Sequence, residues 1–143
     1  MVINGTDLHL FIGADAAEKH VGHAKSHTID MGTGEIDISN KDTGGWDDFL
    51  AGRKNWTASC DAMFDMEDAQ GFEQAFDAWL AGTPVRLVSA IKTGANAIDT
   101  GAMQLVGTAI ITSISLSSGD GEAVTYSVSY KGKGALAKVA AIP

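Results

Sequence analysis

The chain has 143 residues, which favours a single domain, and 45% of them are hydrophobic, which is enough for a packed core and argues against wholesale disorder. The formal net charge of −8 argues against a tight nucleic-acid binder, because such proteins cluster Lys and Arg. A single cysteine excludes an intrachain disulfide framework and suits a reducing cytoplasm. No segment approaches the ~18 apolar residues of a membrane span, and the N-terminal residues do not have the pattern of a signal peptide.

Alternation of apolar and other residues predicts strands in the first half of the chain. Leu8 to Ile12 reads as a short strand, and residues 22–31 as a second one. Gly32 and Gly34 punctuate this second strand before Ile36 and Ile38 resume the alternation. Residues 56–64 then form a half-buried strand, with Trp56, Ala58, Cys60, Ala62 and Phe64 on one face and Thr57, Ser59 and Asp61 on the other.

One amphipathic helix is predicted in the middle of the chain. Its apolar stripe recurs at helical spacing, and consists of Phe72, Ala75, Phe76 and Trp79. Asp65 or Asp68 can cap its start, and Gly82 followed by Pro84 ends it. The stripe can serve as a groove for a ligand or partner, but a helix lying on the sheet of its own domain is the favoured interpretation.

After a strand at Val85 to Ile91, the last part of the chain predicts a hairpin of two long strands, residues 106–117 and 123–130, joined by a turn at Ser118 to Gly121. Each strand has a bulky face, which we expect to be buried, and a face of small or hydroxylated residues that bears almost no charge. Such a wet, uncharged face suits a channel lining, although an ordinary solvent face rich in Ser and Thr is also possible. Residues 131–143 read as a C-terminal tail with an apolar end.

Residues that could carry chemistry do not form a recognisable constellation, so we expect no enzyme activity, metal or cofactor. Motifs for phosphate, dinucleotide or zinc-protease sites are absent. His20, His23 and His27 are the best metal candidates, but no Cys or carboxylate cluster completes their set. Asp47 and Asp48 lack a partner histidine, and Cys60 is expected to be a buried, inert thiol.

The most informative segment is Ser39 to Phe64, which opens with a polar turn and the pair Gly44-Gly45. Large apolar residues, Trp46 and Phe49-Leu50, then stand inside a charged loop. Leaving such groups in water costs stability, so the loop is expected to pack against its own sheet or against a neighbouring copy.

The sequence Lys-Asp-Thr-Gly-Gly-Trp-Asp-Asp-Phe-Leu from position 41, set in the order strand, loop, strand, helix, strand and Ser/Thr-rich hairpin, resembles the major tail proteins of bacteriophages. The resemblance extends from about Asn4 to Lys138. The family is itself similar to the tube proteins of contractile tails and of type VI secretion. It implies one tail tube domain over residues 1–143, mainly β: a β-sandwich or partly open barrel of antiparallel strands flanked by one helix.

The resemblance implies that the chain is a structural subunit of the virion tail, made in the bacterial cytoplasm. Such subunits form hexameric rings, and the rings stack into a tube that carries DNA. Implied partners are further copies of the chain and the tail-tip initiator, tape-measure and tail terminator proteins. The loop at about 39–54 would make contacts within and between rings, through Trp46, Asp47, Asp48, Phe49, Leu50, Arg53 and Lys54. Candidates for the lumen face are Ala109, Ser113, Ser115, Ser117, Thr125, Ser127 and Ser129.

Two alternatives stay open at this stage. The same ring could belong to a phage-tail-like bacteriocin or to a secretion or injection system. A small β-barrel ligand-binding domain is a further alternative, although it would need a pocket with convergent polar groups, which the sequence does not supply.

Overall fold

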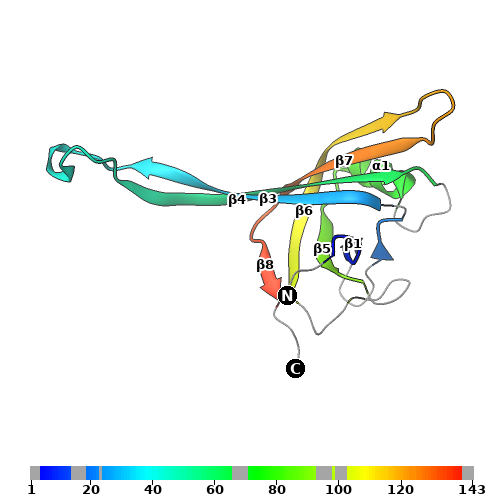
Figure 1. The fold of residues 1–143 in the computed structure, drawn as a ribbon, viewed down its shortest axis with the longest axis horizontal. Helices are drawn as coiled ribbons and strands as arrows, with labels where there is room; N and C mark the ends of the chain where they lie inside the picture. The colour runs from blue at the N-terminus through cyan, green and yellow to red at the C-terminus, as the bar shows by residue number, and fades with distance from the viewer. Residues whose placement is uncertain are drawn as a thin grey trace.

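The computed structural model describes residues 4–13, 19–22, 24–65, 71–92, 98 and 103–139. Its strands form one antiparallel sheet in the order β2-β1-β5-β6-β7-β4-β3, and β8 pairs with β6 off this path (Figure 1). The elements are β1 (Leu8–Ile12), β2 (Lys19–His20), β3 (Ala24–Asp37), a 3-10 helix (Lys41–Thr43), β4 (Phe49–Met63), α1 (Phe72–Ala81), β5 (Val85–Ile91), β6 (Gln104–Ser117), β7 (Thr125–Gly132) and β8 (Ala137–Val139).

The longest feature is a hairpin arm made by the far halves of β3 and β4, which extends well beyond the body of the molecule (Figure 1). The predicted break in the first of these strands is wrong: β3 continues through Gly32 and Gly34, and the irregularity is only a register shift between Thr33 and Glu35. The predicted loop at 39–54 is too long, because β4 begins at Phe49.

The main core lies on one face of the sheet, where β4 contributes every second residue from Trp56 to Ala62. The predicted alternation of this strand is therefore confirmed. Val128 and Tyr130 of β7 extend the core, and Leu87 of β5 closes it from the other end of the sheet. The sheet curls so far that Nε2 of His27 on β3 lies 3.0 Å from Oγ of Ser89 on β5, which makes the fold a partly open barrel.

A β-bulge in β6 changes which residues face the core. Ala109 is fully buried, whereas Ile110 is exposed, the reverse of the predicted faces. The register shifts between Ile111 and Ser113, and one extra residue moves every later side chain to the opposite face. Ile111 and Ile114 consequently both pack on the main core. The prediction that Ala109 shares the outward face with Ser113 is wrong for this reason.

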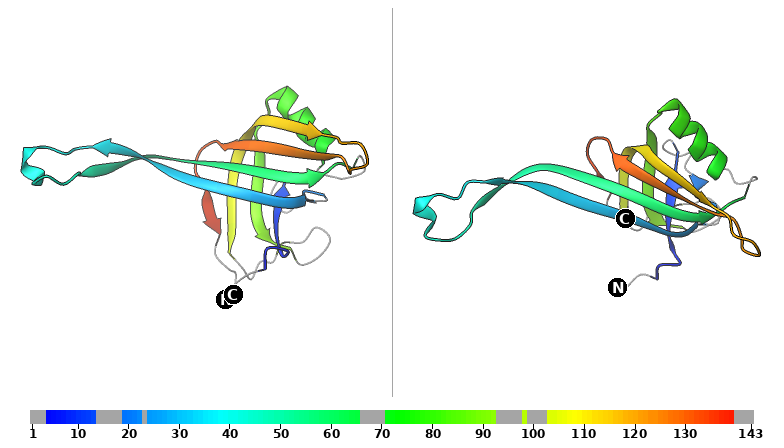
Figure 2. Two further views of the ribbon diagram at one scale, coloured as in Figure 1. Left: turned by 45° about the horizontal axis from the view of Figure 1, so that its top comes forward. Right: turned by 90° about the horizontal axis from the view of Figure 1, so that it is seen from above.

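Helix α1 packs beside β6, as Figure 2 shows, and its predicted end is confirmed: Gly82 adopts a left-handed conformation with φ of 68°. The predicted aspartate cap is wrong at Asp65, and Asp68 lies outside the described residues. The helix starts after Gly71, whose backbone N–H donates to Oε1 of Gln74 at 2.9 Å. Within the described part of the chain, no helix is long and apolar enough to span a bilayer.

The predicted C-terminal tail is partly ordered structure. Residues 131–132 complete β7, and β8 pairs with the start of β6. Residues 140–143 of the predicted tail lie outside the described residues.

Candidate assembly surfaces

The tip of the arm is a turn that is held closed by its own hydrogen bonds. The side chain of Asn40 accepts from the N–H of Asp42 at 2.7 Å, and Gly44 ends the short helix with φ of 68°. At the base of the turn, Ser39 Oγ accepts from the N–H of Asp48 at 2.8 Å, and the N–H of Ile38 donates to the carbonyl oxygen of Asp48 at 2.9 Å. The turn therefore has a defined shape without help from the body.

Large apolar side chains of the arm remain in solvent in the isolated chain. Trp46 at the tip is 81% exposed, and the neighbouring Phe49 and Leu50 are also exposed. Ile36 lies opposite Leu50 and is exposed as well. Of the two sequence interpretations, packing of this loop against its own sheet is thus excluded for Trp46, and the side chains are free for an external contact.

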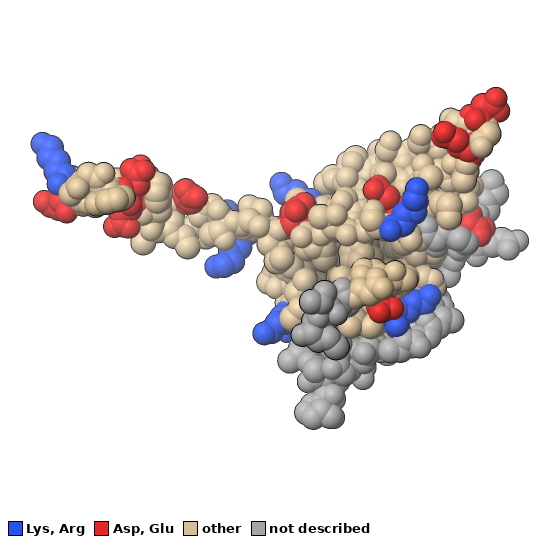
Figure 3. All heavy atoms as spheres, in the orientation of Figure 1, with Lys and Arg blue, Asp and Glu red and all other residues tan. Residues whose placement is uncertain are grey.

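The sequence-predicted arm residues fall into two groups. Trp46, Asp47 and Asp48 belong to the turn, while Phe49, Leu50, Arg53 and Lys54 belong to the first part of β4. Charged side chains of both signs lie along the arm (Figure 3).

A second surface is the hydroxyl face, the side of the β6-β7-β4-β3 sheet that faces away from the core. Cross-strand pairing aligns its residues in rows, of which two are Ser113, Ser129, Ser59 and Thr28, and Ser115, Ser127, Asp61 and Ser26. Thr125 and Ser117 form a further pair. Except for Ala109, the predicted channel-lining residues therefore share one face.

Two further strands, β4 and β3, contribute to the hydroxyl face, and neither was predicted to do so. Thr57, Ser59 and Asp61 of β4 lie level with the β7 residues. The alternation of these three residues was visible in the sequence, but their pairing with β7 was not. Asp61 is held at the centre of the face, where its carboxylate accepts hydrogen bonds from Ser127 and, at 3.4 Å, from Ser26. The face is thus rich in hydroxyl groups but also carries charged groups that were not predicted for it, Asp61 and Lys131, which lies level with Thr57.

The sheet also has free edges on the two sides of the hydroxyl face. β3 is the last strand of the order, so among the described strands its outer edge pairs with none. β5 pairs with β6 only up to Ala109, and no described strand continues along that edge of β6 from 110 to 117. Figure 2 shows β6, β7, β4 and β3 side by side, with α1 beyond β6. Unpaired edges are templates for pairing with another chain.

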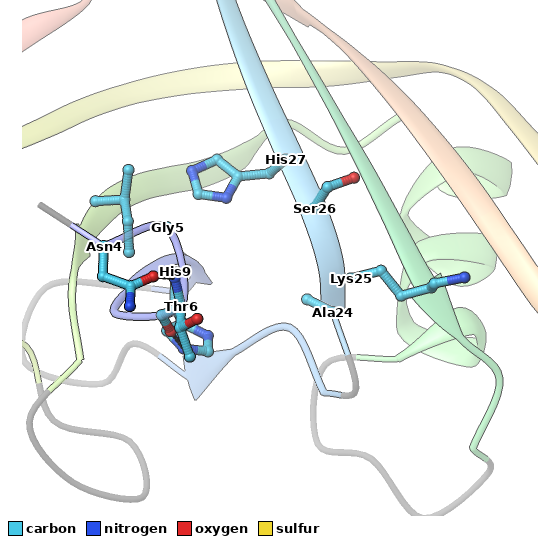
Figure 4. A pocket seen from close by; sticks show the side chains of 9 residues that line it. Asn4, Gly5, Thr6, His9, Ala24, Lys25, Ser26 and His27 are labelled. Atoms are coloured by element: carbon cyan, nitrogen blue, oxygen red, sulfur yellow. Dashed lines mark hydrogen bonds between the residues drawn. The ribbon is translucent and has the colours of Figure 1, made fainter.

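A hollow of about 640 Å³ lies between residues 4–9 and the start of β3 (Figure 4). Its imidazoles are engaged locally: Nε2 of His9 lies 3.1 Å from the carbonyl oxygen of Thr6, and Nε2 of His27 lies 3.0 Å from Ser89 Oγ. Burial lowers the pKa of His27, and the charge of His9 lowers it further. The described residues contain no group of three ligands that could hold a metal ion, and His23 of the predicted trio lies outside them.

Cys60 is buried in the main core, as predicted. Burial raises the pKa of its thiol to about 12, and the nearby negative charge of Asp61 acts in the same direction. Because the thiolate is the reactive form, this cysteine is an inert core residue.

Comparisons with known proteins agree with this geometry. A fold with a TM-score of 0.80 occurs in the tail of an empty gene transfer agent particle refined with C6 symmetry, with 22% sequence identity and coverage of 97% of this chain and 100% of that chain. The SPP1 tail tube has a TM-score of 0.72 at 21% identity, over 99% of this chain and 81% of that chain. A chain in the 6-fold symmetrised baseplate of the anti-feeding prophage has a TM-score of 0.64 at 6% identity, over 99% of this chain and 97% of that chain.

At these identities the likenesses show the fold, which is that of tail tubes. A comparison with curated protein sequences gave no match. A family model described as "Phage tail tube protein" matches residues 2–138, which is nearly the whole chain. The chain therefore belongs to the phage tail tube protein family, as a structural, non-enzymatic component of the tail.

Proposed function

We propose that copies of the chain join edge to edge into a closed ring, and that rings stack into a tube for DNA. The observation that carries this proposal is the pair of free edges, β3 on one side and residues 110–117 of β6 on the other. If the β3 edge of each copy pairs with the β6 edge of the next, the contact is heterologous, and a rotation that closes gives a ring. Six copies are proposed, in line with the C6 symmetry of the similar gene transfer agent tail.

The strand directions are compatible with such a ring. β6, β7, β4 and β3 are all antiparallel to their neighbours, so the directions alternate across the four strands. Because four is an even number, a copy rotated about the ring axis presents β6 antiparallel to the β3 that it meets. The closed sheet is then antiparallel throughout, which removes every edge that could otherwise aggregate.

The hydroxyl face is proposed to line the channel, through Ser113, Ser115, Ser117, Thr125, Ser127 and Ser129. The bulk of the molecule, including α1 and the main core, lies on the opposite side of these strands, and only the outside of a ring has room for it. The face consists mainly of hydroxyl groups, and its cations are not clustered: Lys131 lies level with Thr57, and Lys25 borders a hollow with the carboxylate of Asp61. DNA can therefore slide without being held, because retention would need clustered Lys and Arg.

The arm is proposed to connect a ring with its neighbours. Trp46, Phe49 and Leu50 are exposed apolar anchors on a self-supporting turn, and aromatic anchors supply much of the energy of protein interfaces. Asp47, Asp48, Arg53 and Lys54 would add charge pairing at the same contact. Tail-tip initiator, tape-measure and terminator proteins are proposed as further partners at the ends and in the lumen of the tube.

Negative-stain electron microscopy of the purified protein over a concentration series tests the proposal. Rings or hollow tubes that increase with protein concentration are expected, because the edges pair only between copies. Dispersed monomers at every concentration, even after addition of a tail-tip initiator from the same gene cluster, would contradict it.

A further inference from the structure

The flank of α1 next to the unpaired edge of β6 carries an apolar ridge that the described part of the chain leaves largely uncovered. Phe76 and Trp79 are about half exposed, and Leu80, one turn beyond Phe76, is 69% exposed. The helix contains no buried residue at all. Phe76 and Trp79 border a hollow of about 430 Å³ with Ile114 and Leu116, directly at the unpaired edge of β6. This set, Phe76, Trp79 and Leu80, is called the α1 ridge.

An apolar cleft of about 530 Å³ lies at the opposite end of the four-strand sheet, where the arm leaves the body. Trp56 and Leu136 line it, and so does Met31 of β3, which is 64% exposed. Gly132 and Gly134 line it too and add no side chain to it. Lys54 lines it as well. This hollow is called the arm-root cleft.

Both surfaces lie on the same side of the sheet. Met31 pairs with Trp56, which belongs to the main core, so Met31 points to the core side of β3. α1 packs on that side too, because its Phe72 and Ala75 contact the main core. When β3 of one copy continues the sheet of the next beyond β6, the arm-root cleft is thus carried towards the α1 ridge, and the hydroxyl face is not between them.

The charges of the two surfaces are complementary. α1 carries Glu73 and Asp77 and has no Lys or Arg in its ten residues. The arm-root cleft carries Lys54, and Lys133 stands between its two glycines. Opposite potentials favour encounter in one orientation and disfavour ridge against ridge or cleft against cleft.

We infer that the α1 ridge of each copy docks into the arm-root cleft of the adjacent copy in the same ring. This inference rests on the proposed ring, and it adds a partner surface that strand pairing alone does not require. Backbone hydrogen bonds between strand edges have little side-chain specificity, whereas an aromatic ridge in a matching cleft fixes how far β3 slides along β6. The docking would therefore set the register of the inter-subunit sheet.

Disulfide trapping between two variants tests the contact, each with one added cysteine besides the native Cys60, whose thiol is buried and unreactive. Leu80→Cys and Met31→Cys are prepared separately, mixed and oxidised during assembly. A cross-linked dimer containing one chain of each kind is expected in the mixture. Thr28→Cys is the matched control, since it lies on the same strand but on the hydroxyl face. Equal cross-linking of Leu80→Cys with Thr28→Cys, or no heterodimer in mixtures that form rings, would overturn the inference.

A second variant separates the docking from strand pairing. Leu80→Glu should leave the melting temperature of the monomer unchanged, because the side chain is already in solvent, but should raise the concentration needed for rings at least about tenfold. Ala81→Glu, which adds the same charge next to it in line with Glu73 and Asp77, should not. Rings of Leu80→Glu at the wild-type concentration would overturn the inference. Absence of rings in the unmodified protein would instead refute the proposed function on which it rests.

Discussion

The indole N–H of Trp56 donates a hydrogen bond to the carbonyl oxygen of Gly134 at 3.2 Å, across 78 positions of the chain. This bond ties the root of the arm to the segment that follows β7, so a buried side chain of the core also fixes where the arm leaves the body. The ring of Trp56 occupies the space next to Gly132 and Gly107, and a methyl group on either glycine would overlap it.

Gly132→Ala is therefore expected to lower the free energy of unfolding by about 1–3 kcal/mol, the usual cost of forcing extra atoms into a packed core. Chemical denaturation of the monomer measures the change. Gly5→Ala is the control, because nothing lies within 4 Å of a Cβ at that position. Equal stability of the two variants would mean that the ring of Trp56 is not packed tightly against Gly132 of β7.

Mild acid should destabilise the monomer through His27. Its pKa in the fold lies below the ordinary value of 6.5, so the unfolded chain binds a proton first as the pH falls. The contribution of neutral His27 to the free energy of unfolding is complete above pH 6.5. It is lost as the pH falls towards the lower pKa that His27 has in the folded protein. Melting temperatures measured from neutral pH downwards should fall in this range.

His27→Gln, which keeps a polar partner for Ser89 but cannot titrate, should flatten that fall. Part of the slope should remain, because burial and the charge of Lys92 also lower the pKa of His9. Asp37 does not interfere, since its pKa is lowered by hydrogen bonds from Ser39 and it titrates in much stronger acid. An unchanged slope in the variant would exclude His27 as the sensor.

Cys60 should resist alkylation in the native protein. Its thiol is buried and its pKa is about 12, so the reactive thiolate is scarce at neutral pH. The labelling rate with a small maleimide should follow the rate of global unfolding and rise with denaturant. Fast labelling in buffer alone would show that the core opens locally around β4.

Trp46→Ala combined with Phe49→Ala should block ring or tube formation while the monomer keeps its circular dichroism. Both side chains are exposed, so the monomer loses little by their removal, within the ~0.5 kcal/mol typical of surface changes. Lys41→Ala, at the same tip, should assemble normally. Tubes of wild-type length from the double variant would remove the arm from the proposed contacts between rings.

The hydroxyl face should become inaccessible to large reagents when tubes form. A cysteine at Ser115 should react with a polyethylene glycol maleimide in the monomer but not in the tube, while a cysteine at Thr6 should react in both. Ser115 is exposed in the isolated chain, and so is Thr6. Persistent labelling of position 115 along intact tubes would place the hydroxyl face on the outside.

Much of the fold could be predicted from periodicity alone. The strict alternation from Trp56 to Ala62 and the helical stripe from Phe72 to Trp79 predicted the right elements, because each has an apolar face that packs on the main core and a polar face in solvent. The bulge between Ile111 and Ser113 could not be seen, since both neighbouring registers place isoleucines on a plausible core face. Ala109 was assigned to the wrong side of the sheet as a result.

The surfaces were harder to predict than the elements. Gly32 and Gly34 look like a break in the sequence, yet β3 passes through them, because pairing with β4 outweighs their local preference. Asp61 was assigned to its strand correctly, but its place in the hydroxyl face depends on cross-strand register, which a single sequence does not encode locally. Exposure of Trp46 on a free-standing arm likewise required the three-dimensional arrangement.

A cryo-electron microscopy reconstruction of the assembled protein would show directly how the copies meet. We expect a closed antiparallel barrel in which β3 of one copy pairs with residues 110–117 of β6 of the next, and in which Ser113, Ser115 and Ser127 face the lumen. A tube whose lumen is lined by α1, or whose subunits meet without β3–β6 pairing, would contradict it.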